Sequence, residues 1–130
     1  MRKNFHVGQS NELVAGDRVI DLHNEFDFSE LSLTPYREVR LFFVPHPVHG
    51  KGQAPVVLEF VDVDFFELSA GFGTRIIQDL EEVGYIKKDQ VDDSWLLGED
   101  QATADDHLLF RLGADHIRVH SRQAHLREHR

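Results

Sequence analysis

The clearest pattern of hydrophobic and polar positions is a strict alternation in the last quarter of the chain. Apolar residues at positions 108, 110 and 112 are followed, after Gly113-Ala114, by a second alternating run over residues 116–120. A two-residue turn with glycine first is the mirror-image type that hairpins favour. The pattern therefore predicts a hairpin whose register is fixed, because a slip of one residue would turn every side chain to the wrong face. On the core side Phe110 faces Ile117 and Leu108 faces Val119, while the outer side pairs Arg111 with His116, Leu109 with Arg118 and His107 with His120.

A second hairpin is predicted between residues 26–33 and 38–44, on either side of a turn at Thr34-Pro35-Tyr36. The apolar phase slips at Ser29-Glu30, which indicates a β-bulge in the first strand. Residues 56–66 are the most hydrophobic run of the chain and predict a long central strand. We expect that strand to bend near Val61-Asp62, where its apolar phase shifts.

Residues 74–83 have the period of an amphipathic helix rather than of a strand. Ile76, Ile77, Leu80 and Val83 would share one face, and Gly84 follows where glycine commonly ends a helix. We therefore predict an α+β fold, in which an antiparallel sheet of about five to seven strands has one main helix, at about residues 74–83, packed on one face.

The length and composition are typical of one globular domain spanning residues 1–130, with a polar C-terminal tail that can fray from about residue 122. The chain contains no cysteine, which excludes disulfides and thiolate chemistry and is typical of a reducing compartment. The first residues lack the apolar run of a signal peptide, and no apolar run is long enough to cross a bilayer. We expect a cytoplasmic protein without a membrane partner.

The formal charge of −9 is unevenly distributed along the chain. Residues 79–106 contain ten acidic residues and two lysines, a net charge of −8, whereas residues 107–130 are net positive and contain five histidines. An acidic protein repels phosphate backbones, so we expect no nucleic-acid partner.

The predicted C-terminal hairpin offers a candidate metal site. His107 and His120 would lie opposite each other with His116 nearby, and two imidazoles on a sheet can hold a divalent metal such as zinc. Asp105 or Asp106 could complete the shell. The alternative is that these histidines simply occupy the solvated face of the sheet, where this His/Arg surface could contact a partner.

Four other motifs have both a functional and a plain interpretation. Residues 125–129 match the H-x-x-E-H pattern of inverted zinc proteases, but only Arg130 follows, where that class takes a further ligand. His46-Pro47-Val48-His49 lacks a third ligand and reads as a solvated loop. Residues 71–75 could bind an anion at the start of the predicted helix, or could merely make the turn. Asp62, Asp64 and Glu67 could act as paired carboxylates, or could form the exposed side of a strand end.

No serine or histidine motif of a nucleophilic enzyme is present, so we expect a non-catalytic protein-binding module of an immunity or adaptor type. Its acidic surface would engage a basic protein by charge complementarity. The aromatic residues of the acidic segment would be anchors if they are exposed. The expected partner-binding residues are Tyr85, Asp92, Asp93, Trp95, Asp100 and Asp105. The alternative is a histidine-based metal-binding protein or metal-dependent hydrolase that uses His107, His116 and His120, and self-association through a sheet edge is also open.

Overall fold

The computed structural model describes residues 1–77 and 79–129, which form two β-sheets. The large sheet has seven strands in the order β5-β6-β7-β10-β9-β8, with β1 paired in parallel to β10, and the small sheet has the order β2-β3-β4. The strands are β1 Arg2–Lys3, β2 His6–Val7, β3 Leu13–Ala15, β4 Arg18–Ile20, β5 Phe26–Thr34, β6 Glu38–Pro45, β7 Val56–Leu68, β8 Glu82–Ile86, β9 His107–Leu112 and β10 Asp115–Glu128. A short 3-10 helix, η1, spans Glu99–Gln101.

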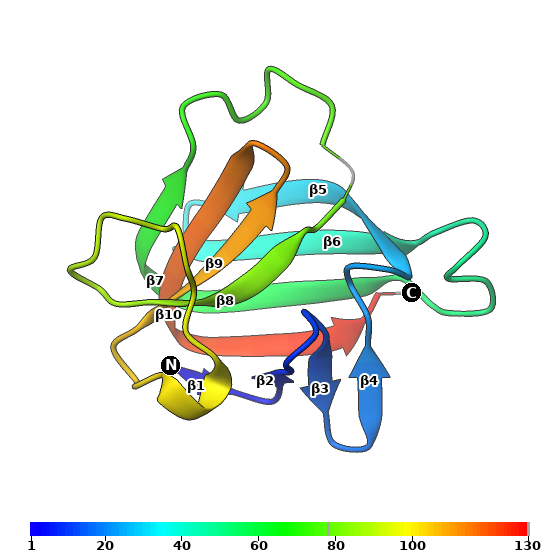
Figure 1. Ribbon diagram of the computed structural model, residues 1–130, viewed down its shortest axis with the longest axis horizontal. Helices are drawn as coiled ribbons and strands as arrows, with labels where there is room; N and C mark the ends of the chain where they lie inside the picture. Colours follow the sequence, from blue (N-terminus) through cyan, green and yellow to red (C-terminus); the bar gives the residue numbers. More distant parts are fainter. Residues whose placement is uncertain (78, 130) are drawn as a thin grey trace.

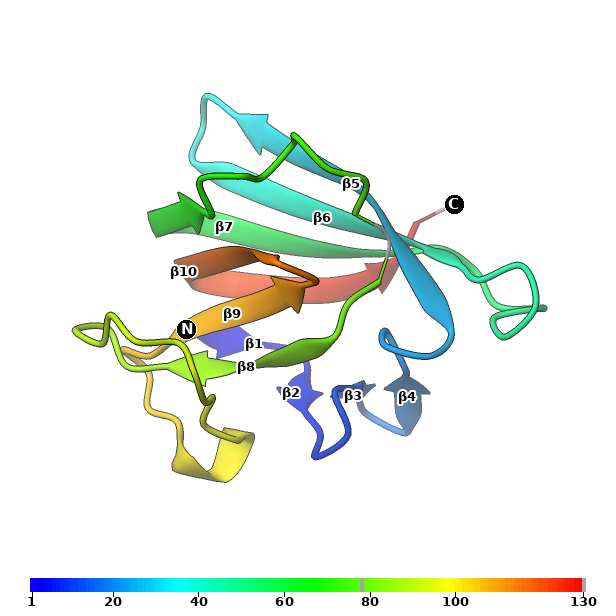
Figure 2. The same ribbon diagram turned by 45° about the horizontal axis from the view of Figure 1, so that its top comes forward.

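The two longest strands, β7 and β10, pair in antiparallel fashion and form the middle of the large sheet (Figure 1). The first half of β10 pairs with β9 on its other side, and its second half pairs there with β1. Figures 1 and 2 show the small sheet beside the C-terminal end of β10, where Arg18 of β4 forms a 2.9 Å ion pair with Glu128.

One hydrophobic core joins the two sheets, because alternate residues of each strand point to the same side. Phe60 of β7 and Phe110 of β9 meet edge to face at 6.2 Å between ring centroids, and both are fully buried. The small sheet adds Leu13 and Ile20 to the same cluster. The core therefore occupies one face of the large sheet and leaves its other face for the features described below.

Both predicted hairpins are confirmed. Phe110 pairs with Ile117 and Leu108 with Val119, as the alternation requires. The β5–β6 pairing shifts register between Phe28 and Glu30, at the predicted bulge. The central strand is also irregular near the predicted bend: Asp62 has a φ of 57°, and the β7–β10 register shifts between His120 and Ser121.

The α+β assignment is wrong, because the described part of the chain contains no helix that packs on a sheet. Residues 69–77 and 79–81 contain no helix or strand, and β8 begins at Glu82, while Gln78 lies outside the described residues. Ile76 is 91% exposed, whereas Leu80 is fully buried, so the predicted apolar face does not exist. A ten-residue helix is marginal without packing. Arg75 is instead held by Asp115, at 2.7 Å from Nη2 to Oδ1, which fixes the loop against the β9–β10 turn.

The segment from residue 122 is not a free tail, since residues 122–128 are the second half of β10. This also removes the H-x-x-E-H interpretation. His125 lies on β10 and His129 follows the last residue of that strand; at roughly 3.3 Å per residue of extended chain the two are about 13 Å apart, which is too far for one metal ion to bind both. Among the described residues, none belongs to a helix that could span a membrane.

Candidate functional site

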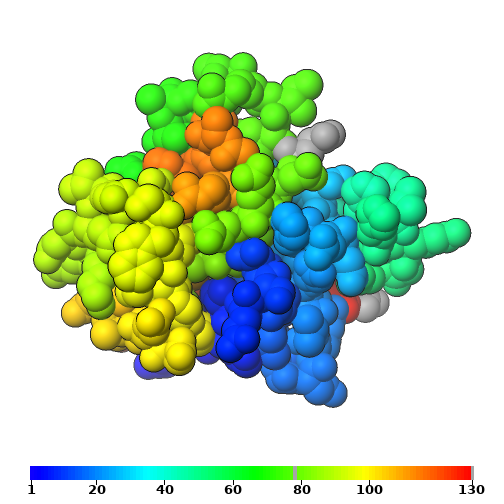
Figure 3. Space-filling model, in the orientation of Figure 1, coloured from blue at the N-terminus to red at the C-terminus, as the bar shows by residue number. Residues whose placement is uncertain are grey.

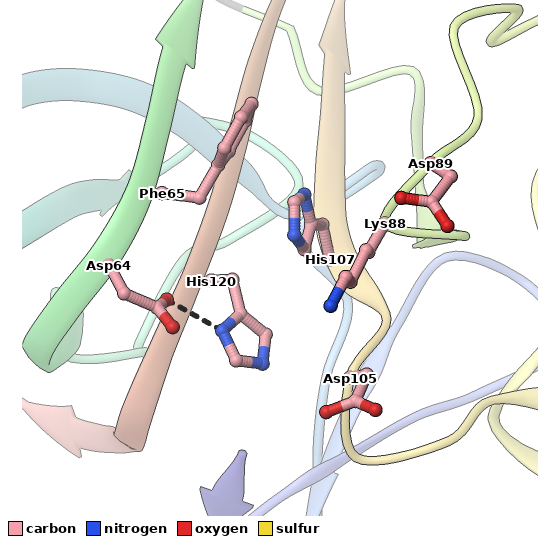
Figure 4. Close-up of a pocket in the computed structure, with 7 residues that line it drawn as sticks. All are labelled: Asp64, Phe65, Lys88, Asp89, Asp105, His107 and His120. Atoms are coloured by element: carbon pink, nitrogen blue, oxygen red, sulfur yellow. Dashed lines mark hydrogen bonds and ion pairs between the residues drawn. The ribbon is translucent and has the colours of Figure 1, made fainter.

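A cleft of about 340 Å³ opens on the face of the large sheet opposite the core. Strands β7, β9 and β10 contribute its floor, and the loops after β8 and before β9 form its rim (Figure 4). Its lining residues are Asp64, Phe65, Lys88, Asp89, Asp105, His107 and His120. The cleft thus brings together two histidines of the predicted metal site and one residue of the predicted partner site.

The irregularity in β7 positions Asp64 at this cleft. His120 pairs with Phe65 and Ser121 with Val63, so Asp64 is the extra residue of a bulge. A bulge redirects the side chain of its extra residue. The Asp64 carboxylate accepts a 2.6 Å hydrogen bond from His120 Nδ1, drawn as the dashed line in Figure 4. Burial by itself raises the pKa of Asp64, but the hydrogen bond and charge of His120 together bring it below its usual value.

Both ring nitrogens of His120 are engaged by acceptors. Nδ1 contacts Asp64, and Nε2 lies 2.9 Å from the carbonyl oxygen of Ala104. His120 is therefore committed to bridging β7 and the segment before β9.

His107 is held in the opposite way, as a neutral ring. Its Nδ1 accepts a 2.9 Å hydrogen bond from Nε of Arg118, which places the proton of the neutral ring on Nε2. Burial, followed by the positive charge of Arg118, lowers the pKa of His107 to about 4. The ring lies between Phe65 and His120, with centroid distances of 4.4 Å and 5.3 Å.

The structure brings two of the three predicted metal ligands together and places the third elsewhere. His116 is turned toward Glu67, at 2.9 Å, and toward Asp93, at 3.8 Å. Asp105 lines the cleft, but Asp106 is buried and accepts from the backbone N–H of Thr103. No group of three or more potential ligands converges among the described residues. A zinc ion at His107 would also require the Arg118 hydrogen bond to be given up, because Nε2 carries the proton.

The outer face of the β9–β10 hairpin is covered rather than exposed, which the sequence interpretation missed. Residues 87–106, here called the acidic loop, connect β8 to β9, and their first part folds over this face. Arg118 is only 7% exposed, and its guanidinium donates to the carbonyl oxygens of Lys87, Lys88 and Gln90 at 2.8–3.2 Å. Arg111 donates to the carbonyl oxygen of Asp93. Part of the acidic loop is thus bound within the molecule by arginines of the β9–β10 hairpin.

The six predicted partner-binding residues separate into buried and exposed groups. Tyr85 is 2% exposed and its hydroxyl donates to Glu99 at 2.7 Å, so it is a core residue and not an anchor; burial, and then Glu99, raises its pKa. Asp93 is half-buried against Arg111, at 3.6 Å. The side chains that remain on the surface are Asp92, Trp95, Asp100 and Asp105.

Two apolar side chains of the acidic loop face solvent. Val91 is 94% exposed and Trp95 is 63% exposed. The segment that contains them forms one side of the molecular face in Figure 3, in yellow-green and yellow. The sequence analysis identified Trp95 but not Val91. Val91 lies between Gln90 and Asp92 and belongs to no helical or alternating hydrophobic pattern.

The remaining motifs do not join this site. His46 and His49 stack on each other at 4.7 Å and line a different cleft with His23. Asp62 pairs with Arg37 at 3.5 Å and Glu67 with His116, so Asp62, Asp64 and Glu67 have three separate partners. No helix follows residues 71–75 in the described part of the chain, which removes the proposed anion site at a helix start.

Arg118, Phe65, Lys88 and Asp89 are the site residues that sequence analysis did not assign to a functional site. One feature of the sequence could have indicated that Arg118 is covered. The predicted register placed it opposite Leu109, on a face that was assumed to be exposed. An exposed leucine beside an arginine is better explained by a covering segment.

Comparison with known proteins found no relative of this chain. No protein-family model matches the chain, and neither a curated protein nor a solved structure matches it.

Proposed function

We propose that the chain is a non-catalytic protein-binding module whose acidic loop engages a basic protein, in the manner of an immunity or adaptor protein. The observation that carries the proposal is the exposure of Trp95 and Val91 on a loop that is otherwise rich in carboxylates. Tryptophan is among the residues most enriched at interface hot spots, and its exposure on an isolated surface loop has no benefit for folding.

The loop is ordered before any partner arrives. Arg118 fixes its start through three carbonyl oxygens, Arg111 holds Asp93, and β8 pairs with Leu97 through reciprocal backbone hydrogen bonds of 2.8 and 2.9 Å with Tyr85. A preorganised loop loses little conformational entropy on binding, so more of the contact energy contributes to affinity.

The carboxylates that remain unpaired define the chemistry of the partner. Asp89, Asp92, Asp100 and Asp105 are exposed and form no ion pair with the described residues. They would attract Lys and Arg side chains around an apolar pocket that receives Trp95, and would mainly increase the association rate and the specificity. The same charges disfavour nucleic acid and anionic membrane surfaces.

A cytoplasmic location is part of the proposal and rests on the absence of cysteine. The alternative of a zinc-binding protein or hydrolase rests on the proximity of the His107 and His120 rings. A zinc titration by calorimetry decides this alternative: a stoichiometric site that disappears in His120→Ala would support it.

Affinity capture with matched variants tests the proposed function. Wild type, Trp95→Ala and Tyr36→Ala are used as baits in parallel; Tyr36 is 78% exposed on the β5–β6 turn and serves as the control aromatic residue. We expect one basic protein to be retained by wild type and Tyr36→Ala and lost with Trp95→Ala. Equal retention by all three baits, or retention only of acidic proteins, would contradict the proposal.

A further inference from the structure

His107 presents a buried hydrogen-bond donor to the cleft. His107 is only 6% exposed, and its Nδ1 accepts a hydrogen bond from Arg118. Its Nε2–H has no hydrogen-bond partner among the described residues. Among the described residues, every side-chain nitrogen or oxygen that is shielded from solvent has a hydrogen-bond partner. Because Nε2 has none, it is accessible, and the open space next to the ring is the cleft. A donor that faces a cleft can be completed by an acceptor atom of a ligand, which then takes the place of water.

Lys88 adds a positive charge at the same place. Its side chain lines the cleft and forms no ion pair with the described residues. Figure 4 shows its amine between His107 and Asp105. A second positive charge, the guanidinium of Arg118, is hydrogen-bonded to His107 Nδ1 at 2.9 Å. The acceptor that fits this corner is therefore an anionic oxygen such as a carboxylate.

The rim of the cleft has the opposite charge. Asp89 and Asp105 are exposed and line its edge, whereas the charge of Asp64 is offset by its hydrogen bond with His120. A simple anion would be repelled by the two rim carboxylates, and a metal cation would be repelled by Lys88 and Arg118. A ligand that carries both charges satisfies both ends of the cleft.

We propose that this cleft binds a small zwitterion of the α-amino-acid class. The ligand carboxylate would accept hydrogen bonds from His107 Nε2–H and from the Lys88 ammonium, and the ligand ammonium would face Asp89 and Asp105. The volume of about 340 Å³ is within the range of small-molecule sites. This inference goes beyond the proposed function and shares Asp89 and Asp105 with it, but its test contains no partner protein, so each can fail without the other.

Titration of the common α-amino acids tests the inference, with the melting temperature and the ¹⁵N shift of His107 Nε2 as readouts. We expect saturable binding of at least one amino acid at about millimolar Kd, with its N-acetyl and methyl ester forms binding about tenfold more weakly because each lacks one charge. Lys88→Gln should weaken binding by about tenfold, while the control Lys51→Gln, at an exposed loop position, should not change it.

Three results would overturn the inference. The first is the absence of saturable binding by any amino acid up to about 20 mM, which corresponds to a binding free energy too small for a built site. The second is unchanged affinity in Lys88→Gln. The third is equal binding of the N-acetyl form, which would show that an anion alone is recognised.

Discussion

At the scale of single residues, Arg118 links the cleft to the acidic loop. Its guanidinium donates to His107 Nδ1 and to three backbone carbonyl oxygens of the acidic loop. It therefore sets the tautomer of His107 and the path of the loop. Lysine cannot reproduce this geometry, because its donors lie on a single nitrogen rather than on a planar fork.

Arg118→Lys tests this role. We expect the free energy of unfolding to fall by about 3 kcal/mol, because buried carbonyl oxygens lose their donors. Urea denaturation measures the change, and Arg122→Lys, at an exposed position of β10, is the control that should lie within about 0.5 kcal/mol of wild type. Equal stability of the two variants would mean that Arg118 does not hold the loop.

The neutral state of His107 predicts a defined pH dependence. Its pKa is about 4 in the folded protein against 6.5 in the unfolded chain, so the unfolded chain binds the additional proton between these values. Stability should be unaffected by this residue above about pH 6.5 and should fall as the pH decreases toward about 4, by up to about 3 kcal/mol at roughly 1.4 kcal/mol per pKa unit.

His107→Gln isolates this contribution, since its amide oxygen can still accept from Arg118. The variant should lose less stability than wild type between pH 7 and about pH 4.5 in urea unfolding, whereas His49→Gln, at an exposed loop position, should follow wild type. Parallel pH profiles for wild type and His107→Gln would show that His107 is protonated in the folded state.

At the scale of elements, β8 contains a glycine at the point where the acidic loop packs directly on it. A Cβ on Gly84 would lie 2.7 Å from Leu96 Cβ and 3.1 Å from the carbonyl oxygen of Leu97. The sequence analysis assigned Gly84 to the end of a helix, but its place is the middle of a strand, where it allows close approach of residues 96–97.

Gly84→Ala should therefore be destabilising by about 1–3 kcal/mol, as is typical of overpacking. Thermal unfolding measures the loss, and increased hydrogen exchange at Leu97, which pairs with Tyr85, would place it at this contact. Wild-type stability with unchanged protection at Leu97 would contradict this explanation of the glycine.

The elements that could be predicted from the sequence are strands with one face toward the core and the other away from it, because their apolar and polar residues alternate. The two hairpins and the bulges were readable because alternation fixes which side faces the core. The segment 74–83 failed because its helical period arises from residues with separate roles: Leu80 enters the core, Ile76 faces solvent and Val83 belongs to β8. The cleft could not be foreseen, since it depends on Asp64 being the extra residue of a bulge and on a loop covering Arg118.

At the scale of the whole molecule, the uneven charge along the chain has two consequences. Part of the acidic segment is neutralised internally, by Arg111 at Glu82 and Asp93 and by Lys87 at Asp106. The exposed remainder lies on the same loop as Val91 and Trp95. We therefore expect partner binding to weaken as salt is raised through the physiological range, because exposed charges are screened over about 8 Å at 0.15 M.

The central claim is that Trp95 is the anchor of a protein interface, and the single tryptophan of the chain makes it directly measurable. The measurement is the fluorescence of Trp95 during titration with the basic protein that the capture experiment retains. The account predicts a saturable blue shift of the emission and protection from acrylamide, because binding removes an indole that is 63% exposed from water. Saturable binding by calorimetry with no change in emission or in quenching would contradict the account, because the partner would then bind elsewhere.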